Sequence, residues 1–118
     1  MLIHPLWAEL VVWEPVLGRL ARERDVIAID LPGFGGSPPL ANGSIPTPRV
    51  LAGAVASFLD ELGLGRVHVA GNSLGGWVAL ELARTGRALS VAGVCTAGLW
   101  TRPLGPRPGG DIRRIGRQ

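Results

Sequence analysis

Hydrophobic positions along this chain fall into short apolar runs and longer stripes at helical spacing. The runs are Leu2-Ile3, the segment VIAI that ends at Ile29, RVHVA over 66–70 and ALSVAGVC over 88–95. Apolar runs of this length without strict alternation are typical of strands that are covered on both faces of a sheet. We therefore predict four buried strands.

The stripes fall between these predicted strands and indicate helices. They are Trp13-Val16-Leu17-Leu20, Leu51-Val55-Phe58-Leu59-Leu62 and Leu74-Trp77-Val78-Leu82. Spacing of three and four positions places each set on one helix face, and Pro15 is tolerated because it lies in a first turn. Gly63, Gly65 and Gly86 supply helix stops. Strands that alternate with helices in this way predict parallel βαβ units of the α/β class.

Length and charge place the folded part in residues 1–102. A chain of 118 residues forms one domain at most. Residues 103–118, PLGPRPGGDIRRIGRQ, have no apolar period, so we expect a Pro/Gly/Arg-rich tail that is disordered or begins a truncated cap. Residues 1–101 hold seven Arg against eight acids, whereas 102–118 hold five Arg against Asp111. The basic charge therefore belongs to the tail, and we expect no nucleic-acid partner.

Several classes of protein are disfavoured by composition. No apolar run approaches the ~20 residues that cross a bilayer, and the N-terminus does not resemble a secretory signal, so we expect a cytoplasmic protein with no membrane partner. A single cysteine, Cys95, forms no internal disulfide, and its apolar neighbours predict a core position. Two His and one Cys offer no metal-ligand spacing, so we expect no metal and no cofactor.

The motif that indicates a catalytic residue lies between the third predicted strand and the third predicted helix. Gly71-Asn72-Ser73-Leu74-Gly75 is G-x-S-x-G. In a sharp strand-to-helix turn, side chains two positions either side of the serine would collide, which accounts for both glycines. The turn lifts the Ser73 hydroxyl above the sheet edge and directs the Leu74 N–H to where an oxyanion would form. Ser73 is therefore the candidate catalytic nucleophile.

The glycine-rich sequence of this turn is compatible with two other interpretations. A glycine-rich turn that merely packs closely stays open as an alternative. A dinucleotide-binding turn requires G-x-G-x-x-G and an acidic residue about 20 positions later. Here the spacing is G-x-x-x-G-G, and residues 91–101 contain no acid. The nucleotide interpretation is therefore disfavoured.

Three motifs in this order resemble the α/β-hydrolase family (AB hydrolase-1 type), as its N-terminal fragment, from Leu2 to Trp100. Besides GNSLGG, LIHPL over 2–6 resembles the end of the family's third strand with its oxyanion loop, and DLPGFGGS over 30–37 is similar to the D-x-x-G-x-G-x-S loop after strand four. The resemblance implies a three-layer α/β/α architecture, a partial α/β-hydrolase fold. Its parallel strands would stand in the order 4-3-5-6 of the family's eight.

The resemblance also implies roles for particular residues. The backbone N–H groups of Leu6 and Leu74 would form the oxyanion hole, and His4 would support the oxyanion loop, in which Pro5 replaces the family's usual Gly. The sequence GNSLGG around Ser73 resembles the corresponding sequence in the esterase, perhydrolase and C–C-bond hydrolase branches of the family. Epoxide hydrolases and haloalkane dehalogenases of the family place Asp at the position of Ser73, which disfavours them.

The partners that activate a serine are not evident in these residues. In the family, the acid and the histidine follow later in the chain, whereas here no acid lies between Thr96 and Gly110, and the only histidine beyond His4 is His68. His68 lies in a predicted central strand and is expected to be packed and hydrogen bonded. A surrogate-base role for His4 stays open as an alternative to its loop-shaping role.

The sequence therefore predicts a hydrolase of ester, thioester or C–C bonds that acts by acyl transfer through Ser73, truncated and inactive alone. Once completed, its substrate would be a small, apolar, ester-like molecule. The alternatives are a non-catalytic fragment of the fold and a small-ligand binding module. Because four strands taken from a larger sheet leave unpaired edges, we also expect self-association through the open sheet edges.

Overall fold

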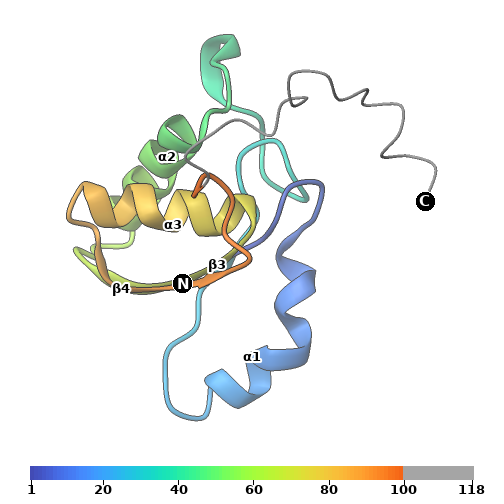
Figure 1. Cartoon of the computed structure of the whole chain (residues 1–118), viewed down its shortest axis with the longest axis vertical. Helices are drawn as coiled ribbons and strands as arrows, with labels where there is room; N and C mark the ends of the chain where they lie inside the picture. Colours follow the sequence, from blue (N-terminus) through green and yellow to red (C-terminus); the bar gives the residue numbers. More distant parts are fainter. Residues whose placement is uncertain (100–118) are drawn as a thin grey trace, which may run out of the picture.

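A computed structural model describes residues 1–99 of the chain. The tail predicted over 103–118, and with it the proposed boundary at residue 102, lies outside the described residues. Figure 1 shows that the described part consists of one sheet with helices on both of its faces.

All strands of the described residues belong to one parallel sheet. They are β1 (Leu2–Ile3), β2 (Ala28–Ile29), β3 (Val67–Asn72) and β4 (Ala88–Val94). Their order in the sheet is β2-β1-β3-β4, so the N-terminal strand lies in the interior. Leu2 is paired with Ala28 on one side and with Ala70 on the other. This is the order 4-3-5-6 expected from the family, and the predicted fold class is confirmed.

The helices are distributed unequally over the two faces of the sheet (Figure 1). They are α1 (Glu14–Leu20), α2 (Pro48–Glu61) and α3 (Leu74–Arg84), with the 3-10 turns η1 (Leu10–Trp13) and η2 (Ala41–Gly43). The pair α2 and α3 packs on one face, and α1 lies on the other. No residue of α1 is buried, so its layer covers the sheet only loosely.

The core lies between the sheet and the pair α2 and α3. One cluster of buried side chains forms this core, with members from the sheet, from the loop after β2 and from both helices. They are Ile3, Leu31, Leu51, Ala52, Val55, Val69, Val78, Ala79 and Leu82. These helical positions repeat every three or four residues, which is why the two stripes were detectable in the sequence. Burial of this cluster is the main stabilisation that the described residues provide.

Two of the three predicted helix stops act as expected. Gly63 follows α2 with φ 70°, and the N–H of Leu64 donates to the carbonyl of Leu59. Gly86 follows α3 with φ 77°, and the next N–H donates back to the carbonyl of Leu82 in the same pattern. Glycine adopts this left-handed conformation without steric cost, so each helix ends there. Gly65 lies beyond the turn and takes no part in the stop.

Three expectations about burial were wrong in whole or in part. Cys95 is exposed rather than core, because it is the first residue after β4 and turns the chain with φ 45°. Trp77 is 36% exposed and its ring lies against Gly98 instead of the core. His68 is hydrogen bonded, to Ser90 Oγ at 2.7 Å, but it is exposed because the helix layer on its face is sparse.

Candidate active site

Ser73 has a backbone conformation that residues with side chains rarely adopt. It lies between β3 and α3, at the N-cap of α3, with φ 52° and ψ −113°. Such a conformation costs on the order of 1–3 kcal/mol and persists only where the surroundings impose it. The turn places Ser73 at the carboxyl end of β3, the edge at which open α/β sheets bind ligands.

The two predicted glycines are required by close backbone approach. A Cβ at Gly71 would overlap the carbonyl group of Gly75, at the start of α3. A Cβ at Gly75 would overlap the carbonyl group of Ile3, at the end of β1. The first contact makes the turn sharp, and the second seats α3 against the neighbouring strand. Glycine at both positions is therefore a condition of this geometry.

A third glycine, Gly76, contributes to the turn and was not singled out in the sequence. A Cβ on Gly76 would stand 2.6 Å from Thr96 Oγ1, in the loop after β4. The doubled glycine of the motif was visible, but its partner lies 20 positions further along, so the sequence offered no direct signal. This contact brings the loop after β4 against the start of α3.

Backbone hydrogen bonds hold Ser73 from both sides. Its N–H donates to the carbonyl of Val94 at the end of β4, at 3.0 Å. Its carbonyl accepts from the N–H groups of Trp77, at 3.2 Å, and Ala97, at 3.0 Å. Ser73 is therefore fixed by the helix it caps and by the adjacent strand, which offsets the cost of its positive φ.

His4 is fully buried, and both of its ring nitrogens are engaged. The N–H of Leu31 donates to Nε2 at 2.9 Å, so Nε2 is an acceptor and the proton is on Nδ1. Nδ1 then donates to the carbonyl of Pro5 at 2.7 Å. The ring also meets Phe34 edge-on, with centroids 5.4 Å apart. His4 thus joins the loops after β1 and β2 and has no nitrogen free to act as a base toward Ser73.

Asp30 organises the loop after β2. Its Oδ1 accepts from the N–H of Leu10 at 2.7 Å, and its Oδ2 accepts from the N–H of Gly36 at 2.9 Å. Its backbone carbonyl accepts from Ser37 Oγ at 2.6 Å. A Cβ on Gly35, which has φ 50°, would overlap the carboxyl group. The D-x-x-G-x-G-x-S pattern therefore describes a loop folded around one carboxylate.

This carboxylate makes stability depend on acid pH. The N–H groups of Leu10 and Gly36 hold the pKa of Asp30 below its ordinary value, and burial opposes this lowering. The unfolded chain therefore binds a proton at Asp30 more readily than the folded chain does. The stabilisation that the ionised Asp30 carboxylate provides is complete above the ordinary carboxyl pKa near 3.9, and it is lost as pH falls through the lower pKa of the folded state.

We expect Asp30→Asn to cost on the order of 1 kcal/mol at neutral pH, because one N–H would face an amide NH₂ instead of an oxygen. The substitution should also reduce the loss of stability between pH 7 and pH 3. Urea unfolding of both proteins at these two pH values measures the effect. Equal losses on acidification in the two proteins would contradict the role given to the carboxylate.

The predicted oxyanion donors lie on segments that meet near Ser73. Leu74 is the first residue of α3, and Leu6 is in the loop after β1, where its side chain is 49% exposed. The close approach of Gly75 to the end of β1 brings these two segments together. N–H groups in a first helical turn have no intrahelical acceptor, so the Leu74 N–H suits an anion. The joint role of Leu6 and Leu74 stays a prediction.

Neither histidine of the sequence is placed as a base for Ser73. Both ring nitrogens of His4 are already hydrogen bonded. His68 is hydrogen bonded to Ser90 on the face of the sheet that α2 and α3 do not cover. Asp30 is engaged with the loop after β2. The structure thus brings together the predicted oxyanion loop, its supporting histidine and the sharp strand-to-helix turn over residues 71–75, which we call the elbow. The titratable groups His4, His68 and Asp30 take part in other hydrogen bonds.

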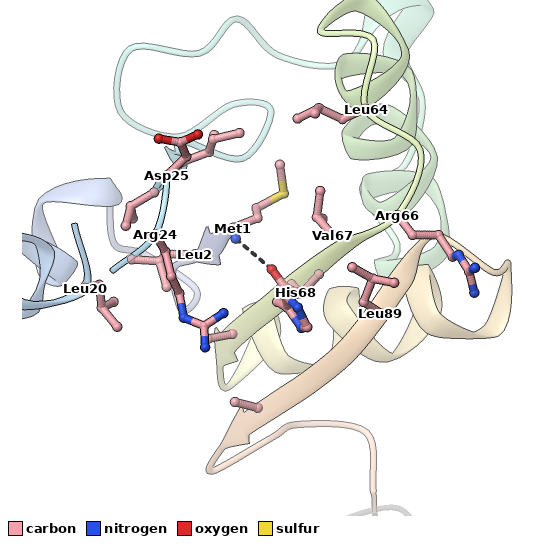
Figure 2. A pocket seen from close by; sticks show the side chains of 15 residues that line it. Met1, Leu2, Leu20, Arg24, Asp25, Leu64, Arg66, Val67, His68 and Leu89 are labelled. Carbon is pink, nitrogen blue, oxygen red and sulfur yellow. Dashed lines mark hydrogen bonds between the residues drawn. The ribbon is translucent and has the colours of Figure 1, made fainter. Parts of the chain in front are cut away.

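Ser73 lines none of three pockets found among the described residues. One, of about 490 Å³, lies on the face of the sheet shared with α1; Figure 2 shows apolar side chains such as Met1 and Leu89 around it, and the Met1 amino group donating to the carbonyl of His68 at 2.7 Å. The others, of about 710 and 550 Å³, lie between α2 and the loop after β2, and beside Trp7. None of these three pockets is therefore a substrate site at Ser73.

None of the helices in residues 1–99 combines the length and apolarity needed to cross a bilayer. Within those residues, no three His, Cys, Asp or Glu side chains gather in a way that could hold a metal ion.

Comparison with known proteins agrees with the fold. The family model described as the alpha/beta hydrolase family matches residues 1–117, so this chain belongs to the α/β-hydrolase family. It is 62% identical over 53 residues, 45% of this chain, to the epoxide hydrolase EphH of Mycobacterium tuberculosis. Among solved structures, it resembles a thermophilic esterase from Thermogutta terrifontis (TM-score 0.77, 30% identity) over 86% of this chain and 38% of the esterase.

The epoxide hydrolase CorEH is also similar, with TM-score 0.78 and 28% identity over 97% of this chain and 41% of CorEH. The chain spans about a quarter of the length of the first curated relatives it matches. The family and a hydrolase function are therefore supported.

Proposed function

We propose that this chain supplies the nucleophile side of a serine hydrolase active site that cleaves ester, thioester or C–C bonds by acyl transfer. The observation that carries the proposal is the strained backbone of Ser73, fixed between the end of β4 and the start of α3. Strain of this kind is retained where it presents a reactive group. A turn that only packed closely would not require a side-chain-bearing residue at positive φ, where glycine is cheaper.

The proposed chemistry is acyl transfer to Ser73 followed by hydrolysis. Ser73 Oγ attacks the substrate carbonyl while a base takes its proton, and the oxyanion that forms accepts hydrogen bonds from the N–H groups of Leu74 and Leu6. Collapse of the intermediate expels the protonated leaving group and leaves an ester on Ser73, which water then hydrolyses. The base and its carboxylate would come from outside residues 1–118, and the substrate would be small, apolar and ester-like.

Epoxide hydrolysis is the second candidate, because EphH and CorEH are both named epoxide hydrolases and the first is highly identical over 53 residues. The elbow residue favours the ester candidate. A serine hydroxyl with an oxyanion hole suits a substrate whose carbonyl oxygen becomes negative, whereas opening an epoxide forms no tetrahedral oxyanion at a carbonyl.

The test is a chimaera in which this chain is completed by the C-terminal part of the Thermogutta terrifontis esterase. We expect hydrolysis of an aryl ester that Ser73→Ala abolishes, with no opening of an aryl epoxide. Epoxide opening that survives in Ser73→Ala would overturn the acyl-transfer proposal in favour of the second candidate. A chimaera that is well folded by circular dichroism but inert on both substrates would instead favour a small-ligand binding module.

A further inference from the structure

The residues that follow β4 turn back and pack against the elbow (Figure 1). We call this segment, residues 95–98, the strap. Cys95 turns the chain with φ 45°, and the side chain of Thr96 then lies in a notch between Gly93 of β4 and Gly76 of α3. A Cβ on Gly93 would overlap Thr96 Oγ1, and a Cβ on Gly76 would stand 2.6 Å from the same atom. The two glycines therefore make room for this one side chain.

Two further contacts hold the strap in place. The N–H of Ala97 donates to the carbonyl of Ser73 at 3.0 Å. Gly98 has φ 80° and lies against the ring of Trp77, which a Cβ at that position would overlap. All of these contacts join residues between 71 and 98, so they do not depend on what lies beside the outer edge of β4.

The bond from Ala97 bears on the predicted oxyanion donor through the geometry of one peptide group. The carbonyl of Ser73 and the N–H of Leu74 belong to the same trans, planar peptide, so they point in opposite directions. That carbonyl accepts one bond from the N–H of Trp77 within α3 and a second one from the strap. Two donors on the carbonyl fix the direction of the N–H on the other side of the peptide, and they polarise it into a stronger donor.

We propose that the strap orients the oxyanion donor of the elbow and that Thr96 is its positioning residue. By filling the notch, Thr96 keeps the N–H of Ala97 on the carbonyl of Ser73, and the shared peptide then directs the N–H of Leu74. An oxyanion forms only as the substrate carbonyl is attacked, so a misdirected donor lowers kcat and leaves KM almost unchanged. The inference rests on the proposed function, because an oxyanion donor has a task only in acyl transfer.

The first experiment measures kcat and KM for the aryl ester in the chimaera with the esterase part. Removal of an oxyanion donor costs about 10²- to 10³-fold in kcat, so Thr96→Ala, which misdirects the donor, should cost about 10- to 100-fold with KM changed less than about twofold. Thr96→Ser keeps the oxygen in the notch and should retain kcat. The matched control is Thr85→Ala at the other end of α3, where the hydroxyl donates to the carbonyls of Glu81 and Leu82. This control should also retain kcat.

A compensating pair of substitutions tests the notch itself. Gly93→Ala alone should lower kcat as Thr96→Ala does, because the added Cβ displaces Thr96 Oγ1. In the double variant Gly93→Ala/Thr96→Ala, the added Cβ takes the vacated space and lies 3.5 Å from the Cβ of residue 96, an ordinary contact. We expect the double variant to exceed each single variant in kcat by at least about fivefold. Losses that simply add, in variants folded by circular dichroism, would contradict the proposal.

The second experiment reads the strap without catalysis, by amide hydrogen exchange in the 118-residue chain. The reference is the N–H of Leu64, which donates to the carbonyl of Leu59 at the end of α2. Thr96→Ala should speed exchange at Ala97 by at least about tenfold with no change at Leu64, and the double variant should reverse the effect. Equal acceleration at both amides would mean a general loss of stability and would overturn the positioning role.

The two proposals fail in different ways. Without Ser73-dependent turnover in the parent chimaera, the proposed function fails, and the oxyanion role of the strap fails with it. With Ser73-dependent turnover in the parent and an unchanged kcat in folded Thr96→Ala, only the role of the strap fails.

Discussion

Replacement of Gly75 by valine is expected to leave no folded protein, whereas the same replacement at Gly53 should be tolerated. At Gly75, the first side-chain carbon already overlaps backbone carbonyl groups of β1, which no rotamer change can relieve. At Gly53, in the middle of α2, nothing lies within 4 Å of the position that a Cβ would take. Steric overlap with a central strand costs upward of about 4 kcal/mol, a large part of the stability of a small domain.

The comparison separates the geometry of the elbow from its chemistry. Gly71→Val should behave like Gly75→Val, while Ser73→Ala should change the free energy of unfolding by less than about 1 kcal/mol, because the backbone strain is the same for both residues. Soluble yield and urea unfolding of the four variants measure these effects. If Gly75→Val and Gly53→Val fold equally well, the turn is not the sharp elbow described above.

The isolated 118-residue chain is expected to show no Ser73-dependent turnover of an aryl ester. The reason is the contrast between a well-formed elbow and the placement of both histidines in other hydrogen bonds. In serine hydrolases, loss of the base or of the whole triad costs on the order of 10⁴ to 10⁶ in rate. Completion of the fold by the esterase part described above should restore a rate increase of that order.

Release of the aryl alcohol by the chain, by Ser73→Ala and by both in completed form measures the difference. Turnover by the isolated chain that Ser73→Ala abolishes would show that residues 1–118 suffice for catalysis. A further variant, His4→Gln, then tests whether His4 acts as a base in spite of its two hydrogen bonds. Loss of turnover in His4→Gln with retained folding would make His4 that base.

The positions of the elements were predictable because local signals specify them. Apolar stripes at helical spacing marked α2 and α3, and Gly63 and Gly86 marked their ends, since each of these signals depends on residues within a few positions. The order of the strands came from the resemblance to the family, since periodicity alone does not say which strands are neighbours. The elbow was predictable because a glycine two positions before and after Ser73 is itself a local steric requirement.

Burial and long-range contacts were less predictable. The apolar runs indicated strands covered on both faces, but in residues 1–99 one face is covered only by α1, so His68 and Leu89 are exposed. Whether an apolar strand is buried depends on what packs against it, which its own sequence does not state. Two further contacts join segments that are distant in the chain: the hydrogen bond from Leu31 to His4 and the contact of Gly76 with Thr96. Local sequence patterns do not reveal such contacts.

The interior position of β1 has a consequence for the order in which the chain folds. During synthesis, Leu2 and Ile3 emerge well before their partner Ala70 in β3. The β3–α3–β4 unit is local in sequence and closes only short loops, so we expect it to form early. Insertion of β1 beside β3 then joins β2 to this unit, and it also seats Gly75 against the first strand. The strained serine turn is therefore completed by a segment that was made earlier.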